Sequence, residues 1–490
     1  MVIVQIIYLI AVIWLSLCGL YSLWLTLSYW RIRRRVPLAP SLTRFPRVTV
    51  QLPLYNERYV VERLLASVAA LDYPRDRLQV QVLDDSADDT TELAQRLVAR
   101  YAADGLDIEL VHRSDRTAYK AGSLALGLCT ATGEYVAIFD ADFLPPSDWL
   151  LHTLPYLEAQ PDLGYVQTRW GHLNDTSSFL TMAQALVLDI QFAIEHPTRC
   201  ASGCFVNANG TAGIWRRTCI DSSGGWAGDT LTEDLDLSFR TQIAGWRVLY
   251  LRDVSAGGEL PGAMSAFRAQ QFRWVKGAAQ CLRKLARRVW CSRHPLVVRL
   301  EALAHLSICL AYPAAMALLL VSLPLIAFHD IPEARPLAFL SLGALGLPSA
   351  MLAAQYELYG RGRRGGRWWR RAVHIPLALV LGAGLAANNA RATLEGLLNH
   401  SSPFQRTPKG VAAGVGRKDR HEYVLSLGRG VWLDLVLAVY TAVTIMTALR
   451  RDEFWMLPFL LLCGLGLCLV SALSLQEGLA PTPSHTDRRG

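Results

Sequence analysis

The residues most able to do chemistry lie in the segment 225–276, and the first group of them is acidic. Within eight positions the chain places four carboxylates, at Asp229, Glu233, Asp234 and Asp236. Repulsion between neighbouring negative charges raises the pKa of at least one of these groups, which suits it to accepting a proton. The segment is therefore a candidate source of a general base.

A polar and aromatic group follows at Gln270, Arg273 and Trp274. An amide and a guanidinium together can bind a diphosphate, and an indole can stack on the flat face of a sugar ring. A proton acceptor close to a phosphate-binding group is typical of a site that transfers a chemical group from one molecule to another.

A second acidic motif follows a predicted strand. Asp140 and Asp142 come directly after the apolar segment 135–139 and are separated by one residue. Two carboxylates this close destabilise the fold by repulsion unless a cation joins them. Hard carboxylate oxygens suit Mg²⁺ or Mn²⁺ held together with a diphosphate. The motif therefore predicts a divalent cation as cofactor.

Two further segments at predicted strand ends have both a binding and a structural interpretation. Asp84 and Asp85 follow the predicted strand 78–83 and could bind a ligand or cap the next helix. The segment 51–57 ends in Glu57, which could read a nucleotide base or ribose. The alternative for that segment is an ordinary turn.

Basic side chains cluster between the two acidic strand ends. They are His112, Arg113, Arg116 and Lys120, with Tyr119 among them. A cradle for phosphates is favoured over a solvated surface, because Gly122 lets the backbone approach a ligand closely.

Two other segments could contact a ligand. In the segment 404–409, Thr407 and Lys409 could reach phosphates from a loop that closes over the site, or the loop could simply lie on a membrane surface. Trp170 could line the path of a sugar or belong to the core, and core positions are the more frequent for aromatic residues.

The chain between residues 48 and 139 alternates predicted strands with predicted helices. The strands are expected at 48–54, 78–83, 108–112 and 135–139, and the helices at 57–71, 89–103 and 120–129. This alternation predicts an α/β fold with an open, mostly parallel sheet covered on both faces. Such sheets bind ligands at the carboxyl ends of their strands, where both strand-end acidic motifs fall.

Composition predicts an integral membrane protein with a soluble insert. The chain is 52% hydrophobic, and its apolar residues concentrate in the first thirty positions and after Ala302. Much of the net charge of +8 comes from arginines that flank the apolar runs, which indicates membrane anchoring and no nucleic-acid partner. The ten cysteines are scattered, which favours free thiols in a reducing compartment.

Hydropathy divides the chain into membrane and cytosolic parts. We expect a span at 1–30, a cytosolic domain at 31–300, a helix pair at 301–360, an interfacial helix with a loop at 361–428, a second helix pair at 429–475 and a disordered tail at 476–490. Within the pairs, the spans are expected at 304–328, 337–354, 432–449 and 454–475. Basic sequence on both sides of 372–387 favours an interfacial or re-entrant helix there, because a crossing would place one basic loop outside.

In order and spacing, the motifs resemble those of processive family 2 glycosyltransferases, the group of cellulose, chitin and hyaluronan synthases. The matching set is Asp84-Asp85, Asp140-Ala141-Asp142, Thr232-Glu233-Asp234, Gln270 with Arg273-Trp274, and 404–409. Longer stretches are closer to plant cellulose-synthase-like mannan synthases and their bacterial relatives, among them QLPLYNERYVVERLL, VQTRWGHLN, NGTAGIWRR and QQFRWVKG. The resemblance is dense over 48–277 and thinner over 390–409. It implies a GT-A-type, nucleotide-sugar-binding domain inserted between transmembrane helices.

The resemblance also implies roles for the acidic strand ends. Asp84 or Asp85 would hold the base and ribose of the donor. Asp140 and Asp142 would bind the metal and diphosphate, Asp142 most directly. The segment 404–409 would form a gating loop over the donor.

For the segment 225–276 the resemblance implies the residues that carry out the transfer and bind the acceptor. Asp234 would be the general base, with Glu233 beside it. Gln270 and Arg273 would hold the diphosphate or the acceptor. Trp274 would stack beneath the acceptor sugar at the entrance to a membrane channel.

These expectations form one hypothesis, an inverting, metal-dependent hexosyltransferase. It would transfer hexose from GDP-mannose or UDP-glucose to a growing β-linked polysaccharide, mannan-like or glucan-like, and move the product across the bilayer. The alternative is a non-processive enzyme that makes a β-glycosyl diacylglycerol or ceramide. A transporter or sugar-binding module with degenerate catalysis is disfavoured by the intact motifs. The catalytic domain is expected in the cytosol, at a bacterial inner membrane or, in a eukaryote, at the Golgi.

Overall fold

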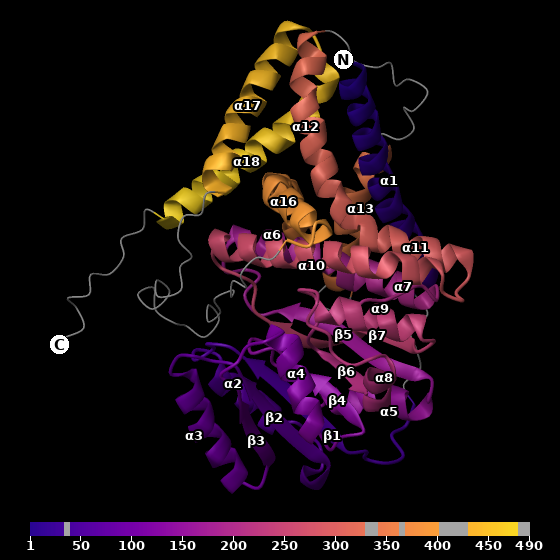
Figure 1. The fold of residues 1–490 in the computed structure, drawn as a ribbon, viewed down its shortest axis with the longest axis vertical. Coiled ribbons are helices and arrows are strands. Elements are labelled where there is room, and N and C mark those ends of the chain that lie inside the picture. Colours follow the sequence, from indigo (N-terminus) through magenta and orange to yellow (C-terminus); the bar gives the residue numbers. More distant parts are fainter. Residues whose placement is uncertain (34–39, 329–341, 362–367, 401–429, 479–490) are drawn as a thin grey trace, which may run out of the picture.

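A computed structural model of the chain describes all residues except 34–39, 329–341, 362–367, 401–429 and 479–490. Figure 1 shows two parts, an α/β domain that contains the sheet and a group of long helices that rises from it. The first helix and the last two lie in the same part, although the sheet domain separates them in sequence. The chain therefore leaves the helical part, forms the sheet domain and returns.

The described residues form one sheet of seven strands in the order β3-β2-β1-β4-β6-β5-β7. Their bounds are β1 (Val48–Leu54), β2 (Leu78–Asp84), β3 (Asp107–His112), β4 (Tyr135–Ile138), β5 (Leu163–His172), β6 (Gly213–Arg216) and β7 (Arg247–Gly258). All neighbouring pairs are parallel except those that β6 makes with β4 and β5. The predicted open, mostly parallel sheet is confirmed.

The centre of the sheet is buried on both faces, which explains why its strands are almost continuously apolar. Every residue of β2 is buried, and only Pro53 in β1 is partly accessible. The polar exceptions pair with each other: Gln51 Nε2 donates to Gln81 Oε1 at 3.0 Å across the two strands. A buried amide is tolerated when its hydrogen bonds are made inside the protein.

Helices cover both faces of the sheet (Figure 1). They are α2 (Val61–Ala69), α3 (Thr90–Ala103), α4 (Tyr119–Thr130), α5 (Trp149–Ala159), α8 (Arg217–Ser222) and α9 (Glu233–Ile243).

The first of these helices begins later than the predicted start at residue 57. Asn56 has a φ of 55°, and its side-chain oxygen accepts a hydrogen bond from the backbone of Ala87. The Ser86 hydroxyl in turn accepts a bond from the Asn56 backbone N–H. These bonds join the turns after β1 and β2, so α2 starts only at Val61.

A layer of helices separates the sheet from the long helices (Figure 1). It consists of α6 (Phe179–Ile190), α7 (His196–Ala201) and α10 (Met264–Trp290). The bent pair α15 (Ile375–Gly384) and α16 (Ala386–Leu397) contacts this layer, and α13 (Gly346–Gln355) packs on α6. Residues 270–274, which the sequence analysis singled out, lie on α10.

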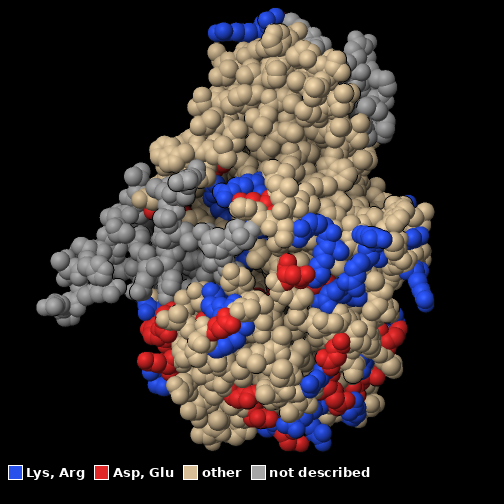
Figure 2. All heavy atoms as spheres, viewed as in Figure 1, with Lys and Arg blue, Asp and Glu red and all other residues tan. Residues whose placement is uncertain are grey.

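Four helices among the described residues are long and apolar enough to cross a membrane. They cover Val2–Ile32 (α1), Leu296–Ala327 (α11, Leu296–Ser307, with α12, Ala311–Ala327), Gly430–Arg450 (α17) and Phe454–Gly478 (which contains α18, Leu457–Gly478). Figure 2 shows this part almost without charged side chains, in contrast to the sheet domain.

The segment predicted to be interfacial or re-entrant lies in a bent helix pair, Trp368–Gly384 with Ala386–Leu397, whose two halves form an angle of 48°. Taken as one unit, this pair would be a fifth candidate span. The predicted span 337–354 lies partly outside the described residues, and its described portion contains α13.

A carboxylate from the last long helix caps α10. Both oxygens of Glu477, in α18, accept hydrogen bonds from the first backbone N–H groups of α10, those of Met264 and Ser265. The N–H groups of a first helical turn have no partner within the helix. A negative charge there is also stabilised by the positive end of the helix dipole.

Two ion pairs attach the rest of α10 to the membrane-side helices. Arg268 is hydrogen-bonded to the buried Asp434 of α17. Two turns further on, the buried Lys276 donates to Glu395 of α16 at 3.1 Å. The helix that carries Gln270 to Trp274 is thus held from its membrane side by three helices from the C-terminal third of the chain.

Candidate active site

A cavity of about 240 Å³ lies between the edge of the sheet and α10. Its walls come from the residues just after β1, β2 and β4, from the ends of β5 and β7, from the turn before β6 and from α10. Parallel strands bring their carboxyl ends to one edge, and the antiparallel β6 begins at that same edge. This is why segments distant in sequence meet here.

Most of the predicted site residues line this cavity. They are Glu57, Asp85, Lys120, Asp140, Asp142, Glu233, Asp234, Gln270, Arg273 and Trp274. Asp84 does not reach it, and Thr407 and Lys409 lie outside the described residues. The separate motifs thus share one cavity.

Asp84 is fully buried and is bonded to protein through both carboxylate oxygens. Oδ1 accepts from the Ser86 backbone, and Oδ2 contacts the hydroxyl of Thr91 and the ring of His112. These bonds organise the turn after β2. Asp84 therefore has a structural role and does not contact the cavity.

Lys120 connects the two acidic motifs of the cavity. Its Nζ donates to Asp140 Oδ1 and to the carbonyl of Gly210, the latter at 2.8 Å, and lies 3.9 Å from Glu233 Oε1. Burial lowers the pKa of Lys120, but the carboxylates of Asp140 and Glu233 outweigh burial and leave this pKa above its usual value. Lys120 is therefore a fixed positive charge at the centre of the site.

The turn that presents Lys120 is strained and is held by Asp85. Ala118 and Tyr119 both have positive φ, at 60° and 48°. Arg113 bridges this turn to the sheet, because it binds both oxygens of Asp85 and also donates to the carbonyl of Tyr119. Strained backbone persists where its surroundings determine it, and such positions often occur at functional sites.

Asp234 has the properties of a general base. Burial, reinforced by the neighbouring charge of Glu233, raises the pKa of Asp234 to about 7. A Cβ atom at Gly210, whose φ is +74°, would come within 3.1 Å of Asp234 Oδ2 and 3.3 Å of Lys120 Nζ. Glycine at this position therefore lets the backbone approach both functional groups.

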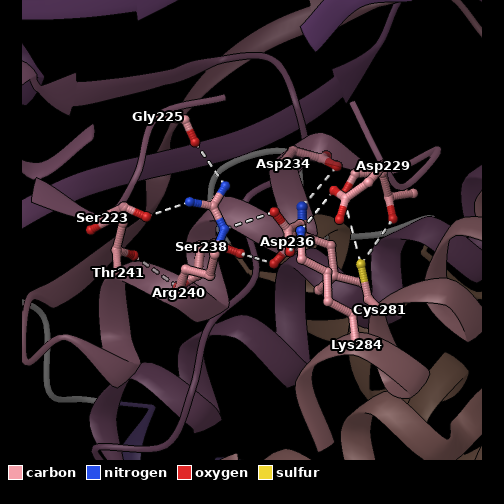
Figure 3. A network of polar contacts seen from close by, with 12 residues as sticks. Ser223, Gly225, Asp229, Asp234, Asp236, Ser238, Arg240, Thr241, Cys281 and Lys284 are labelled. Carbon is pink, nitrogen blue, oxygen red and sulfur yellow. Dashed lines mark hydrogen bonds and ion pairs between the residues drawn. The ribbon is translucent and has the colours of Figure 1, made fainter. Parts of the chain in front are cut away.

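The other two acids of the segment 229–236 have a structural role (Figure 3). Asp236 is fully buried and pairs with Arg240 at 2.8 Å and Lys284 at 2.9 Å. Asp229 also pairs with Lys284, at 2.7 Å. The sequence indicated repulsion among four carboxylates as the cause of a raised pKa, whereas burial is the larger cause at Asp234, and these cations neutralise Asp229 and Asp236.

Arg273 places a second positive charge in the cavity. Gln270, Arg273 and Trp274 are three and four residues apart on α10, so they lie on one face of this helix. Burial lowers the pKa of Arg273, while the charges of Glu233, Asp140, Asp234 and Asp142 act in the opposite direction. A guanidinium keeps its charge under these conditions, so Arg273 and Lys120 together offset the acids of the site.

The carboxylates of Asp140 and Asp142 fit a divalent cation that is shared with a ligand. Asp140 is bonded to Lys120, and Asp142 Oδ2 accepts from the backbone of Glu259 at 3.2 Å. Among the described residues, no three His, Cys, Asp or Glu side chains are grouped so that they alone could hold a metal. Two hard oxygen donors in a cavity instead match a cation whose coordination is completed by phosphate oxygens and water.

The end of the cavity near β1 and β2 has the features of a nucleotide site. Tyr55, Glu57 and Arg116 line it together with Asp85. The guanidinium carbon of Arg116 lies 3.3 Å from the centre of the Tyr55 ring. A flat cation stacked on an aromatic ring provides both charge and a planar surface for a ligand.

The opposite end of the cavity is aromatic. The ring centres of Trp170 and Trp274 are 6.3 Å apart, and Trp170 also packs against Phe143 and Phe192. Both interpretations of Trp170 therefore apply, since this side chain is packed against the core on one side and lines the cavity on the other.

Several cavity residues were not singled out from the sequence. They are Asn209, Gly210, Glu259 and His172. A glycine in a polar segment was the only available signal for Asn209 and Gly210. Nothing local distinguishes Glu259, which reaches the cavity because its strand partner ends at the same edge.

Comparison with known proteins supports the assignment from motifs. Residues 46–277 match the family described as glycosyltransferase like family 2. Probable glucomannan 4-beta-mannosyltransferase 7 of Oryza sativa subsp. japonica is 42% identical over 246 residues, which cover 49% of this chain and 42% of that protein. Glucomannan 4-beta-mannosyltransferase 1 of Cyamopsis tetragonoloba is 39% identical over 263 residues, which cover 53% of this chain and 50% of that protein. The chain spans about half the length of the relatives it matches.

The fold is similar to that of a solved mannosyltransferase from Pyrobaculum calidifontis, in complex with GDP-Man and Mn²⁺. The TM-score is 0.54 at 24% identity, over 81% of this chain and 100% of that one. The likeness shows a GT-A-type fold. The resemblance inferred from the motifs is thus confirmed: residues 46–277 match the glycosyltransferase family 2 model, and over that region the chain is similar to glucomannan 4-beta-mannosyltransferases.

Proposed function

We propose that this chain is a membrane-embedded, inverting mannosyltransferase. It transfers mannose from GDP-mannose to the end of a growing β-linked saccharide. The observation that carries the proposal is the convergence of Asp234, Asp142, Arg273 and Trp274 on one cavity. The choice of mannose rests on relatives about 40% identical that are named glucomannan 4-beta-mannosyltransferases.

The reaction begins at Asp234. Its carboxylate takes the proton from an acceptor hydroxyl, and the hydroxyl oxygen attacks the anomeric carbon of the donor sugar. A new carbon–oxygen bond forms as the bond to the diphosphate breaks on the opposite face, which inverts an α-linked donor into a β-linked product. A pKa of about 7 matches this role, because the base is substantially ionised at neutral pH and still binds a proton readily.

The cations of the cavity stabilise the leaving nucleoside diphosphate. Arg273 and Lys120 line the cavity together with the acids and would stabilise the charge that develops on the departing oxygen. Asp140 and Asp142 would hold a divalent cation, Mg²⁺ or Mn²⁺, which supplies further positive charge to the diphosphate. Tyr55, Glu57 and Asp85 line the end assigned to the nucleoside.

The acceptor enters from the side of α10. Trp274 offers the surface on which the terminal sugar stacks, and α10 is attached to the membrane-side helices through Lys276 and Arg268. A polar polymer cannot cross hydrocarbon unaided, so those helices would supply its path. We propose the cytosolic side for the catalytic domain, because nucleotide sugars are made there.

The test is a donor screen on the purified protein in detergent or lipid nanodiscs. GDP-mannose and UDP-glucose are each supplied with Mg²⁺ or Mn²⁺, and the released nucleoside diphosphate and the product are both measured. We expect release of GDP and a product that β-mannanase degrades. Release of UDP alone would show that the donor is UDP-glucose and not GDP-mannose. A single-sugar glycolipid as the sole product would show that the acceptor is a lipid and not a growing polymer.

The variant Asp234→Asn connects this activity to the cavity. It should lower turnover by about 10²–10⁴-fold while GDP-mannose still binds. Asp221→Asn is the matched control, because Asp221 is a largely exposed carboxylate on α8 outside the cavity. Equal turnover of the two variants would remove Asp234 as the base.

A further inference from the structure

The wall of the cavity beyond Trp274 contains a buried histidine–aspartate pair that the proposed reaction does not use. His172 ends β5, and only 3% of its side chain is exposed. It lines the cavity together with Trp170 and Trp274, and its Nε2 lies 3.0 Å from Asp189 Oδ1 on α6. A buried polar pair that faces a cavity needs a reason in binding or in catalysis.

Gln355 and Arg371, which contact Asp189, decide which ring nitrogen of His172 carries the hydrogen. Asp189 Oδ2 accepts from Gln355 Nε2 at 2.9 Å, and Arg371 lies 3.6 Å from the same oxygen. Burial acts to raise the pKa of Asp189, but the bonds from His172 and Gln355 and the charge of Arg371 outweigh burial and lower this pKa. Asp189 is therefore an ionised acceptor, and the His172 ring donates to it through Nε2–H, in the tautomer that carries its lone pair on Nδ1.

The other nitrogen of His172 is then a hydrogen-bond acceptor. Within the described residues, the ring of His172 makes no hydrogen bond besides the one to Asp189. The side chain lines the cavity, so a ligand bound there can contact this ring. A neutral nitrogen with a lone pair at a cavity wall suits a hydroxyl donor.

The position of His172 places this acceptor close to the reacting groups. In the sheet register His172 pairs with Gly258, and the next residue, Glu259, donates its backbone N–H to Asp142. Trp170 lies two residues before His172 and so on the same face of β5, and its ring centre is 6.3 Å from that of Trp274. His172 thus lies beside the residue that precedes the backbone donor to Asp142, and on the same strand face as Trp170.

We propose that His172 is an acceptor-binding residue for a saccharide. Its Nδ1 accepts a hydrogen bond from a hydroxyl of the sugar that stacks on Trp274, and Asp189 fixes the tautomer and the orientation of the ring. The inference rests on the proposed transfer reaction and specifies its acceptor, a sugar with a hydroxyl at this position. A diacylglycerol has only the reacting hydroxyl and would gain nothing from this contact.

The first test compares His172→Phe with wild type on added β-1,4-linked manno-oligosaccharides. Loss of one hydrogen bond in a buried site costs about 1–2 kcal/mol, so the acceptor KM should rise by about tenfold. The KM for GDP-mannose should change much less than the KM for the acceptor. His152→Phe is the matched control, because His152 forms a similar pair with Asp148 on the exposed surface of α5.

The second test identifies the hydroxyl with monodeoxy acceptors. In wild type, one deoxy acceptor should lose about as much affinity as His172→Phe loses with the full acceptor. Combining that acceptor with the variant should cost nothing further, since both remove the same bond. His172→Leu provides the same comparison if the phenylalanine variant does not fold, because leucine also lacks a hydrogen-bond acceptor. A purely structural role for His172 would give additive losses instead.

Three outcomes overturn the inference. They are an unchanged acceptor KM in His172→Phe, an equal rise in the KM for GDP-mannose, and additive losses with every deoxy acceptor. In each of these cases the wild-type reaction still stands. If wild type transfers no sugar to any saccharide, the proposed function fails first and the inference falls with it.

Discussion

The ammonium of Lys120 donates a hydrogen bond to the carboxylate of Asp140, across the gap between the start of α4 and the end of β4. The same ammonium lies 3.9 Å from Glu233 at the start of α9. One cation thus joins two acidic motifs that are almost a hundred residues apart in the chain. This contact makes the close approach of the site carboxylates possible before any ligand arrives.

We therefore expect Lys120→Met to impair catalysis strongly. Without this cation, Asp140 and Glu233 repel each other and the departing diphosphate loses a positive partner, so kcat should fall by about 10²–10³-fold. Steady-state release of nucleoside diphosphate measures the effect. Lys284→Met is the comparison, because Lys284 pairs with Asp229 and Asp236 outside the cavity and its loss should lower Tm while kcat is retained.

The rate should depend on the ionisation of Asp234. The free enzyme needs this carboxylate deprotonated, and burial raises its pKa to about 7, so kcat/KM should rise with pH and level off above about pH 7. A pH profile of GDP-mannose turnover at saturating metal measures the midpoint. The assay range, about pH 5.5 to 8, brackets that pKa. A kcat/KM that does not change over this range would contradict the role of Asp234 as the base.

Asp234 should also lower stability at neutral pH. A carboxyl whose pKa is higher in the folded state than in the unfolded state binds its proton more tightly when folded. Its favourable contribution is present below the unfolded pKa and is lost as pH rises to the folded value. Asp234→Asn should therefore raise Tm relative to wild type at pH 7.5, and the difference should shrink towards pH 4. Thermal unfolding in detergent, followed by intrinsic fluorescence at both pH values, measures this, and a lower Tm of the variant at pH 7.5 would contradict the sign.

Removal of divalent cations should stop the reaction reversibly. Treatment with EDTA should abolish turnover, and added Mn²⁺ or Mg²⁺ should restore it, because Asp140 and Asp142 supply only part of the coordination. Asp142→Asn should require at least about tenfold more metal for half-maximal activity. Full turnover in EDTA would show that Arg273 and Lys120 suffice to stabilise the leaving group.

The hydrogen bonds by which Glu477 of α18 caps α10 should stabilise the folded protein. Glu477→Ala removes the carboxylate that accepts from Met264 and Ser265, and the loss of such a cap costs about 1 kcal/mol. The Tm of Glu477→Ala should be lower than that of wild type. The Tm of Glu477→Gln should fall less, because the glutamine amide oxygen still accepts one hydrogen bond. Glu62→Ala, at an exposed position of α2, is the control. Equal Tm values for all three variants would show that the cap contributes nothing.

The sequence alone determined the class of the fold and most of the cavity. Alternating strands and helices make a parallel sheet, and a parallel sheet brings its carboxyl ends to one edge, so Asp85, Asp140 and Asp142 had to meet there. The side-chain types of Gln270, Arg273 and Trp274 likewise predicted that they act together, and α10 then places them on one face. These relations are local or follow from one topological rule, which is why a linear pattern carries them.

Only the tertiary structure decided which residue of each motif reaches the cavity. Asp84 and Asp85 are neighbours, yet only Asp85 lines the cavity. The carboxylate of Asp84 is hydrogen-bonded inside the fold by Ser86, Thr91 and His112. In the same way, cations on α9 and α10 removed Asp236 and Asp229 from the acidic cluster and left Asp234 with its raised pKa. Burial and charge partners come from chain segments far away in sequence, so no local pattern contains them.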